Sequence, residues 1–157
     1  MATRWLTADQ QRTWRAFLDA TQLVFATVDD ELQRDADLPH TYYEVLVRLS
    51  EAPNRALRMS QLAVASLSSK SRISHAVARL EERGWVRRME CASDRRGQIA
   101  QLTEDGYAAL AAAAPGHVRC VRTVLFDALT DGQAASLREI CEAIRERLSD
   151  EAAGSAG

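Results

Sequence analysis

The sequence predicts a mainly α-helical fold with a small β-wing, centred on a winged helix-turn-helix. Three observations carry this prediction. Residues 59–83 contain two short helical patterns joined by a tight connection, and Gly84 follows them. Residues 86–103 form two segments, the first of them alternating, on either side of a charged tip, as the strands of a β-hairpin do. Longer segments with apolar residues at helical spacing lie on both sides of this region.

Length and composition indicate one ordinary globular domain. The 157 residues suffice for a hydrophobic core, and 46% hydrophobic with 27% charged residues is typical of such proteins. We see no apolar run near the ~20 residues that a membrane span needs, and no signal-peptide segment at the N-terminus. Cys91, Cys120 and Cys141 are widely spaced, which predicts no metal site, no cofactor, no disulfide framework and a cytoplasmic location.

The first long helix is predicted from a capping box. Thr7 and Gln10 have the required spacing, and the helical pattern continues to about Asp35. Helical spacing predicts one buried stripe on this helix, made of Trp14, Phe17, Leu18, Thr21, Phe25, Val28 and Leu32.

A second helix is predicted after Pro39. Thr41 and Glu44 form another capping-box pattern, and the helix extends to about Ser50 before a break at residues 53–54. The residues expected to point inward are Tyr42, Val45, Leu46 and Leu49.

The central region follows. Two helices are expected over about 60–65 and 69–83, and the second ends at Gly84, a natural residue just past a helix C-terminus. Strands are expected over 86–91 and 98–103, with residues 91–98 as the tip loop, where Gly97 permits a turn with positive φ.

Two further helices complete the chain. Thr103 can cap a helix that begins at Glu104, and the residues at 115–116, Pro and Gly, interrupt or kink it. The last helix begins near Asp131. The residues that we expect it to bury are Ala134, Leu137, Ile140, Cys141, Ile144 and Leu148.

Charge is distributed unevenly. The net charge of −2 by itself argues against a nucleic-acid ligand. Between Arg55 and Gly97, however, ten Lys/Arg residues face only four acids, which leaves a surplus of six positive charges, so the rest of the chain carries −8. A basic face on an acidic body is the electrostatic footprint of DNA binding, although a mixed solvated surface explains the charge alone equally well.

The second helix of the pair has the chemistry of a recognition helix. Its inner face is formed by Ile73, Ala76, Val77 and Leu80. The residues expected to contact DNA are Ser71, Arg72, Ser74, His75 and Arg79, with Lys70 and the helix N-terminus suited to a phosphate. For any single residue a solvated polar face is an equal explanation, but the position of the helix before a wing favours DNA.

The wing tip is more specific. Adjacent arginines at a hairpin tip, Arg95 and Arg96, are poorly explained by folding and well explained by an electronegative minor groove. Asp94 beside them can orient one guanidinium through a charge-assisted pair.

At these residues the chain resembles the MarR family of bacterial transcriptional regulators. The matching text is D-R-R at 94–96, L-T-E-D-G at 102–106, and V-A-R-L-E-E-R-G-W-V at 77–86, with M-S-Q-L-A at 59–63 upstream. The resemblance implies a homodimer that binds a palindromic operator on double-stranded DNA and usually represses. On this match Arg96 is the minor-groove arginine and Asp94 its orienting partner.

The resemblance also implies the organisation of the chain. Residues 1–38 would form an N-terminal dimerisation helix and 39–103 the winged helix-turn-helix DNA-binding lobe. Residues 104–150 would form C-terminal dimerisation helices, and 151–157 a disordered tail. Family members that sense peroxide carry a Cys near the N-terminal helix, and here no Cys precedes Cys91, which is more simply a small apolar residue.

Effector binding is the least specific expectation. Many members of the family release DNA when a small, often phenolic ligand binds between their lobes. The residues that could line such a cavity are Trp14, Phe17, Tyr42, Tyr43 and His117, although aromatics at helical spacing are more often plain core. Two rival functions stay open: a winged-helix protein-interaction module, against which the arginine tip argues, and an enzyme, for which we find no motif.

Overall fold

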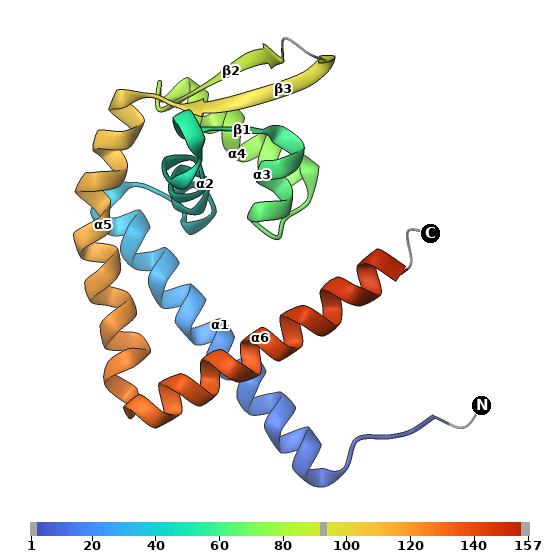
Figure 1. Cartoon of the computed structure of the whole chain (residues 1–157). Coiled ribbons are helices and arrows are strands. Elements are labelled where there is room, and N and C mark those ends of the chain that lie inside the picture. The colour runs from blue at the N-terminus through green and yellow to red at the C-terminus, as the bar shows by residue number, and fades with distance from the viewer. Residues whose placement is uncertain (1–2, 92–93, 155–157) are drawn as a thin grey trace. The chain divides into compact units, whose positions relative to one another are not determined.

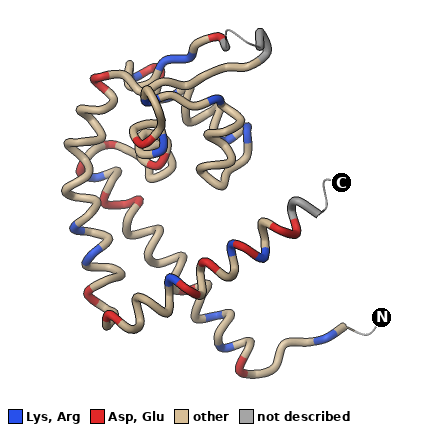
Figure 2. Tube along the Cα trace, viewed as in Figure 1, with Lys and Arg blue, Asp and Glu red and all other residues tan. Residues whose placement is uncertain are grey.

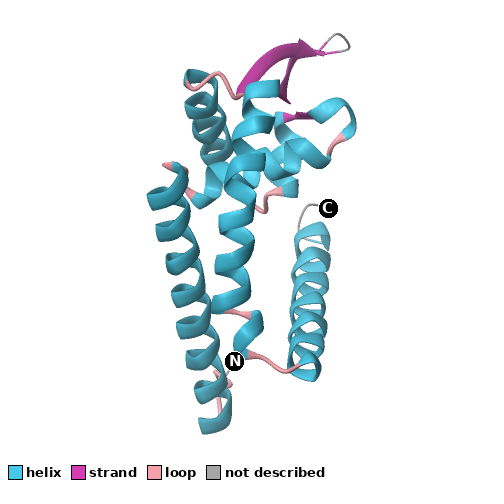
Figure 3. Ribbon diagram, turned by 90° about the vertical axis from the view of Figure 1, so that its left-hand side faces the viewer, coloured by secondary structure: helices cyan, strands magenta, loops and turns pink. Residues whose placement is uncertain are grey.

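The structure is a computed structural model that describes residues 3–91 and 94–154, and it is mainly helical with one three-stranded sheet (Figures 1 and 3). The elements in chain order are α1 (Ala8–Ala36), α2 (His40–Glu51), the 3-10 turn η1 (Pro53–Arg55), β1 (Ala56–Arg58), α3 (Met59–Ala65), α4 (Lys70–Glu82), β2 (Val86–Cys91), β3 (Asp94–Leu102), α5 (Glu104–Val124), the 3-10 turn η2 (Phe126–Ala128) and α6 (Asp131–Gly154). The chain divides into two compact units, one ending at Arg119 and the other beginning at Cys120.

The core of the first unit lies between α2, α3, α4 and the sheet. The predicted inner face of α4 is confirmed, because its four residues are at most 1% exposed. They meet Val45, Leu46 and Leu49 of α2 and Leu62 of α3, all fully buried. Ala100 of β3 and Val86 of β2 close the core on the sheet side. This packing fixes which face of α4 remains exposed.

The capping prediction holds at α1 and is wrong at α2. Thr7 and Gln10 form the reciprocal capping box. Helix α2 instead begins at His40 with Pro39 as its N-cap, because proline presets a helical φ one residue earlier. The Asp29 carboxylate of α1 accepts a hydrogen bond from the partly buried His40 N–H at 2.7 Å, and Tyr43 rather than Tyr42 is buried.

The sheet is larger than predicted. A short strand, β1, pairs antiparallel with β3, which gives the order β1-β3-β2. Strands β2 and β3 pair in a regular register from Val86↔Leu102 to Glu90↔Gln98. The register then shifts, so that Cys91 is paired with Asp94. Residues 95–97 therefore lie in an irregular stretch of β3 rather than in a loop, and the strand begins four residues before the expected Gln98.

Much of the apolar stripe predicted on each long terminal helix is exposed among the described residues. Of the predicted α1 stripe only Val28 and Leu32 are buried, whereas Trp14, Phe17 and Phe25 are exposed. The expected burial on α6 is likewise wrong for the single chain, since Ile140 is 57% and Leu148 is 59% exposed. Amphipathic helices usually bury such stripes against another element.

Helix α5 runs through Pro115 without ending, so proline does not interrupt it. Helix α6 extends to Gly154 and carries both signs of charge along its length (Figure 2). Among the helices that the structure describes, none is long and apolar enough to span a membrane.

Candidate nucleic-acid interface

Helix α4 presents the predicted recognition residues together on one surface. Ser69 caps the helix by accepting a hydrogen bond from the Arg72 N–H at 3.2 Å. The turn before it contains Leu67 with φ of +47°, which reverses the chain between α3 and α4. The six predicted contact residues of α4 are all exposed: Lys70, Ser71, Arg72, Ser74, His75 and Arg79. The surface combines hydroxyls, an imidazole and cations, the groups that contact base edges and phosphates.

One of these cations is already paired. The Arg79 guanidinium donates to the Glu82 carboxylate at 2.8 Å, one turn further along α4. This hydrogen bond, together with the charge of Glu82, raises the pKa of Arg79. The pair is well exposed and therefore contributes little to stability, so Arg79 can exchange Glu82 for a phosphate or base at small cost.

The wing extends from the same end of the unit. Its hairpin strands β2 and β3 continue to Cys91 and Asp94 (Figure 1). Asp94, Arg95 and Arg96 belong to β3, but their side chains lie outside what the structure describes, so their proposed roles stay predictions. The register shift places the backbone of these residues where the hairpin departs from regular pairing.

Arg88 of β2 connects the wing to α4. Its guanidinium donates to the Ser74 carbonyl at 2.7 Å, and its Nε lies 3.3 Å from the Glu81 carboxylate. The other oxygen of Glu81 accepts the Arg88 backbone N–H at 2.9 Å. No feature of the sequence pattern singled out this residue, because its partners belong to a helix that precedes the Gly84 turn.

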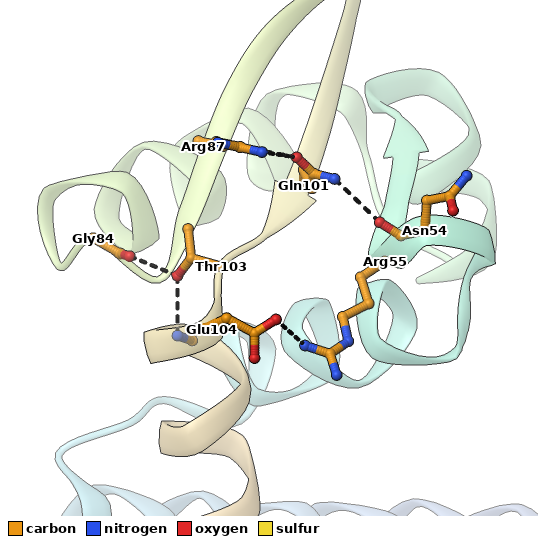
Figure 4. A network of polar contacts seen from close by, with 8 residues as sticks. Asn54, Arg55, Gly84, Arg87, Gln101, Thr103 and Glu104 are labelled. Carbon is orange, nitrogen blue, oxygen red and sulfur yellow. Dashed lines mark hydrogen bonds and ion pairs between the residues drawn. The ribbon is translucent and has the colours of Figure 1, made fainter.

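The base of the wing is joined to α5 through Thr103 (Figure 4). The Thr103 hydroxyl donates to the Gly84 carbonyl at 2.7 Å and accepts the Gly106 N–H at 3.0 Å, which confirms the predicted cap of α5. Gly84 has φ of +73°, as expected for the residue that ends α4. A Cβ at Gly106 would lie 2.1 Å from the Trp85 carbonyl oxygen, so only glycine permits this approach.

Other basic residues in the charged region are also held by protein groups, among them Arg87 and Arg55. Arg87 donates to the Gln101 side chain at 2.6 and 2.8 Å, and the Gln101 amide donates to the Asn54 carbonyl at 3.2 Å (Figure 4). Arg55 pairs with Glu104 at 3.0 Å and lies 3.9 Å above the Tyr107 ring. The positive surplus predicted from sequence thus includes arginines that brace β1, β3 and α5.

The predicted ligand aromatics fall into separate groups. Trp14 and Phe17 stack on α1 with ring centroids 6.1 Å apart. Tyr43 and His117 lie 4.4 Å apart, with the His40 ring 6.1 Å from His117. Burial and then His40 lower the pKa of His117, and burial raises the pKa of Tyr43. Tyr42 is half-buried on α2.

A cavity of about 350 Å³ lies elsewhere, between α1, α2 and the α3–α4 turn. Phe25 and His40 line it, and so do Arg48, Ser66 and Ser68. Each of these three side chains has a buried polar atom that lacks a hydrogen-bond partner: Arg48 Nε, Ser66 Oγ and Ser68 Oγ. Arg72 of the recognition surface also lines it. Unsatisfied buried donors are uncommon and suit a bound polar group. Within the described residues, no group of three metal-binding side chains occurs.

The arrangement of α3, α4 and the β2–β3 hairpin defines the class of winged helix-turn-helix proteins. Comparisons with known proteins then identify the family. The MarR family model matches residues 36–97. The crystal structure of Sco3205, a MarR family transcriptional regulator from Streptomyces coelicolor, in complex with DNA, is similar with a TM-score of 0.90 and 52% identity, covering 93% of this chain and 92% of that one. AbsC, a MarR family transcriptional regulator from the same organism, gives a TM-score of 0.88 and 40% identity over 94% and 99%.

Among curated proteins, the transcriptional repressor MprA of Escherichia coli (strain K12) is 32% identical over 108 residues. That match covers 69% of this chain and spans 61% of the length of the relative. The chain belongs to the MarR family, so the resemblance seen in residues 59–106 is confirmed. These relatives are described as transcriptional regulators and not as enzymes.

Proposed function

We propose that this protein is a sequence-specific DNA-binding transcriptional regulator. It acts in the cytoplasm as a homodimeric repressor on a palindromic operator. The observation that carries the proposal is the exposed polar and cationic face of α4, held rigidly by the opposite, fully buried face. A relative that is 52% identical was crystallised with DNA, which supports the same use here. Helix α4 enters the major groove and the wing reaches the adjacent minor groove.

The wing supplies the sharpest test. Replacing Arg96 with alanine removes a cation from the predicted wing tip, and changes at a solvent-exposed position of that kind usually alter stability by no more than about 0.5 kcal/mol. A lost minor-groove arginine costs roughly 1–3 kcal/mol of binding. We therefore expect Arg96→Ala to keep the melting temperature and to bind about ten- to a hundredfold more weakly to a duplex selected by the parent protein from a random pool.

The salt dependence of binding completes this test. Arg96→Ala should give a shallower slope of affinity against salt, because one phosphate-region cation is gone. Arg95→Ala should act in the same direction more weakly. Parental affinity in Arg96→Ala would rule out the wing as a DNA reader. Failure of the parent to select any duplex would instead favour a winged-helix protein-interaction module.

The cavity beside the α3–α4 turn supports regulation by a small ligand. Its unpartnered donors suit an oxygen-rich group, and Phe25 with His40 suits a flat ring, so an aromatic acid is the ligand class that fits. Because Arg72 lines the cavity, a bound ligand would contact the recognition surface directly.

The test uses salicylate and 4-hydroxybenzoate as probes. We expect one of them to raise the melting temperature and to weaken DNA binding in the parent, and to do neither in Ser66→Ala. The same response in both proteins would place the ligand elsewhere, and no response in either would remove this part of the proposal.

A further inference from the structure

A two-point contact joins the wing to the recognition helix away from the base of the hairpin. Arg88 reaches back from β2 to α4, where it meets the Ser74 carbonyl and the Glu81 carboxylate. Ser74 and Glu81 are seven residues apart, which is two helical turns, so both lie on the same side of α4. The Ser74 carbonyl points toward the C-terminus of the helix and the Glu81 side chain tilts toward its N-terminus, so the two groups converge on one guanidinium.

The contact combines hydrogen bonds with an ion pair, and the buried Arg88 Nε has no hydrogen-bond partner beyond that ion pair. Both carboxylate oxygens of Glu81 are engaged, one by the Arg88 backbone N–H at 2.9 Å and one by Nε at 3.3 Å. The Ser74 hydroxyl lies 3.5 Å from the same guanidinium nitrogen that donates to its carbonyl. The side chains of Arg88 and Glu81 are only 25% and 31% exposed. The charge of Arg88 is therefore directed at protein groups rather than at solvent.

The contact lies beyond the turn that joins α4 to β2, so it can restrain rotation of the hairpin about that turn. At the base, β2 follows α4 through a turn held by the Gly84 N–H to Glu81 carbonyl bond at 2.9 Å and the Trp85 N–H to Leu80 carbonyl bond at 3.0 Å. These two hydrogen bonds fix the backbone path of the turn. They restrain rotation of the hairpin about the turn less than a contact further along the strands does. Arg88 lies further out, and its strand partner Ala100 of β3 is fully buried. A contact at this position therefore restrains both strands of the wing.

We propose that Arg88 is a positioning residue for DNA recognition. Together with Glu81 and Ser74 it fixes the angle between α4 and the wing, so that both elements meet their grooves at once. The inference rests on the proposed function, since it concerns how that DNA surface is held. Preorganised surfaces bind more tightly because less freedom is lost on binding, and this gain applies only to the duplex that both elements fit.

Arg88→Lys is the informative change. Lysine keeps the charge but cannot contact two sites with one planar group. Arg87→Lys is the matched control, because Arg87 is the neighbouring residue on the other face of β2 and its side chain binds Gln101 instead. Each variant is measured by fluorescence anisotropy on the duplex selected by the parent and on poly(dI-dC), over a series of salt concentrations.

We expect Arg88→Lys to lose about tenfold in affinity for the selected duplex and less than about twofold for poly(dI-dC), with an unchanged salt slope. Arg87→Lys should stay within about twofold on both. Equal losses on both duplexes would mean that Arg88 contacts phosphate directly, and parental behaviour would mean that the contact does not position the wing. Either result overturns the proposal.

A second variant covers the case in which Arg88→Lys fails to fold. Glu81→Gln keeps an oxygen for the Arg88 N–H but removes the charge that holds the guanidinium, so the selected duplex alone should weaken, by about threefold. If both variants fold, the double variant should lose no more than Arg88→Lys alone, because they break one interaction. Unchanged discrimination in Glu81→Gln would overturn the proposal. A parent protein that selects no duplex would instead remove the proposed function, and this inference with it.

Discussion

Arg79, one of the predicted DNA-contact residues, is already paired within α4. In the structure its guanidinium is bound to Glu82, which would also place a negative charge near the DNA backbone. Exposed pairs of this kind are weak because water screens them, so breaking one before binding lowers affinity only by a modest factor. If Arg79 contacts DNA as proposed, we expect Glu82 to oppose tight binding.

Glu82→Gln should therefore strengthen binding to the selected duplex by about two- to fivefold without altering the melting temperature appreciably. Glu51→Gln, at the exposed end of α2, makes the same change in net charge and serves as the control. Anisotropy titrations at one salt concentration give the comparison. An equal gain in both variants would show that only net charge matters, and no gain would show that Arg79 does not face DNA.

At this scale, sequence periodicity predicted which α4 residues are exposed, because the buried face is set by local helical spacing. It could also have indicated the pairing of Arg79 with Glu82, three residues apart on one helix. It could not indicate the contact of Arg88 with Ser74, because that distance depends on how the Gly84 turn folds β2 back along α4.

The position of the first turn of α5 depends on the absence of a side chain at Gly106. Gly106 allows the helix to approach the Trp85 carbonyl, which is backbone and cannot move aside like a flexible side chain. Gly106→Ala should destabilise the fold by about 1–3 kcal/mol, measured by urea unfolding. Gly132→Ala is the control, since a Cβ there meets nothing within 4 Å, and it should leave stability equal or slightly higher. Equal stability of the two variants would contradict the close approach.

The packing of α5 on α2 makes stability depend on pH. Burial, and then the neighbouring His40, lowers the pKa of His117. Such a histidine binds fewer protons when folded than when unfolded, so its contribution is present above the unfolded value of about 6.5 and is lost as pH falls through the folded pKa. The melting temperature of the parent should fall more between about pH 7.5 and pH 5.5 than that of His117→Gln. Parallel decreases in the two proteins would assign the effect to other groups.

Elements were predicted well where the signal is local and poorly where it is not. The helices and the two wing strands follow from spacing, caps and Gly84. Strand β1 was missed because three residues, Ala-Leu-Arg, carry no pattern and are extended only through pairing with β3. The capping box expected at Thr41 was displaced by Pro39, with Asp29 of another helix satisfying the N–H instead.

At the scale of the whole molecule, both long terminal helices carry exposed apolar residues. Helix α1 leaves Trp14, Phe17 and Phe25 exposed, and α6 leaves Ile140, Ile144 and Leu148 exposed along one helical stripe. Sequence spacing identified both stripes but could not say what covers them, because an intramolecular and an intermolecular partner give the same pattern. Contiguous apolar surface of this kind marks a protein–protein interface, and a second copy of the chain is the occupant that a two-fold operator requires.

We therefore expect a dimer that depends on α6. A chain shortened to end at Thr130 lacks this helix and should be monomeric in light scattering, with the selected duplex bound far more weakly because only one half-site is held. Ile144→Asp in the full chain should shift the equilibrium toward monomer, since it buries a charge in the interface, whereas Ser149→Asp on the same helix should not. A shortened chain that is folded, dimeric and binds the duplex would show that α6 covers no partner. In that case the stripe on α1 would be left to form the dimer alone.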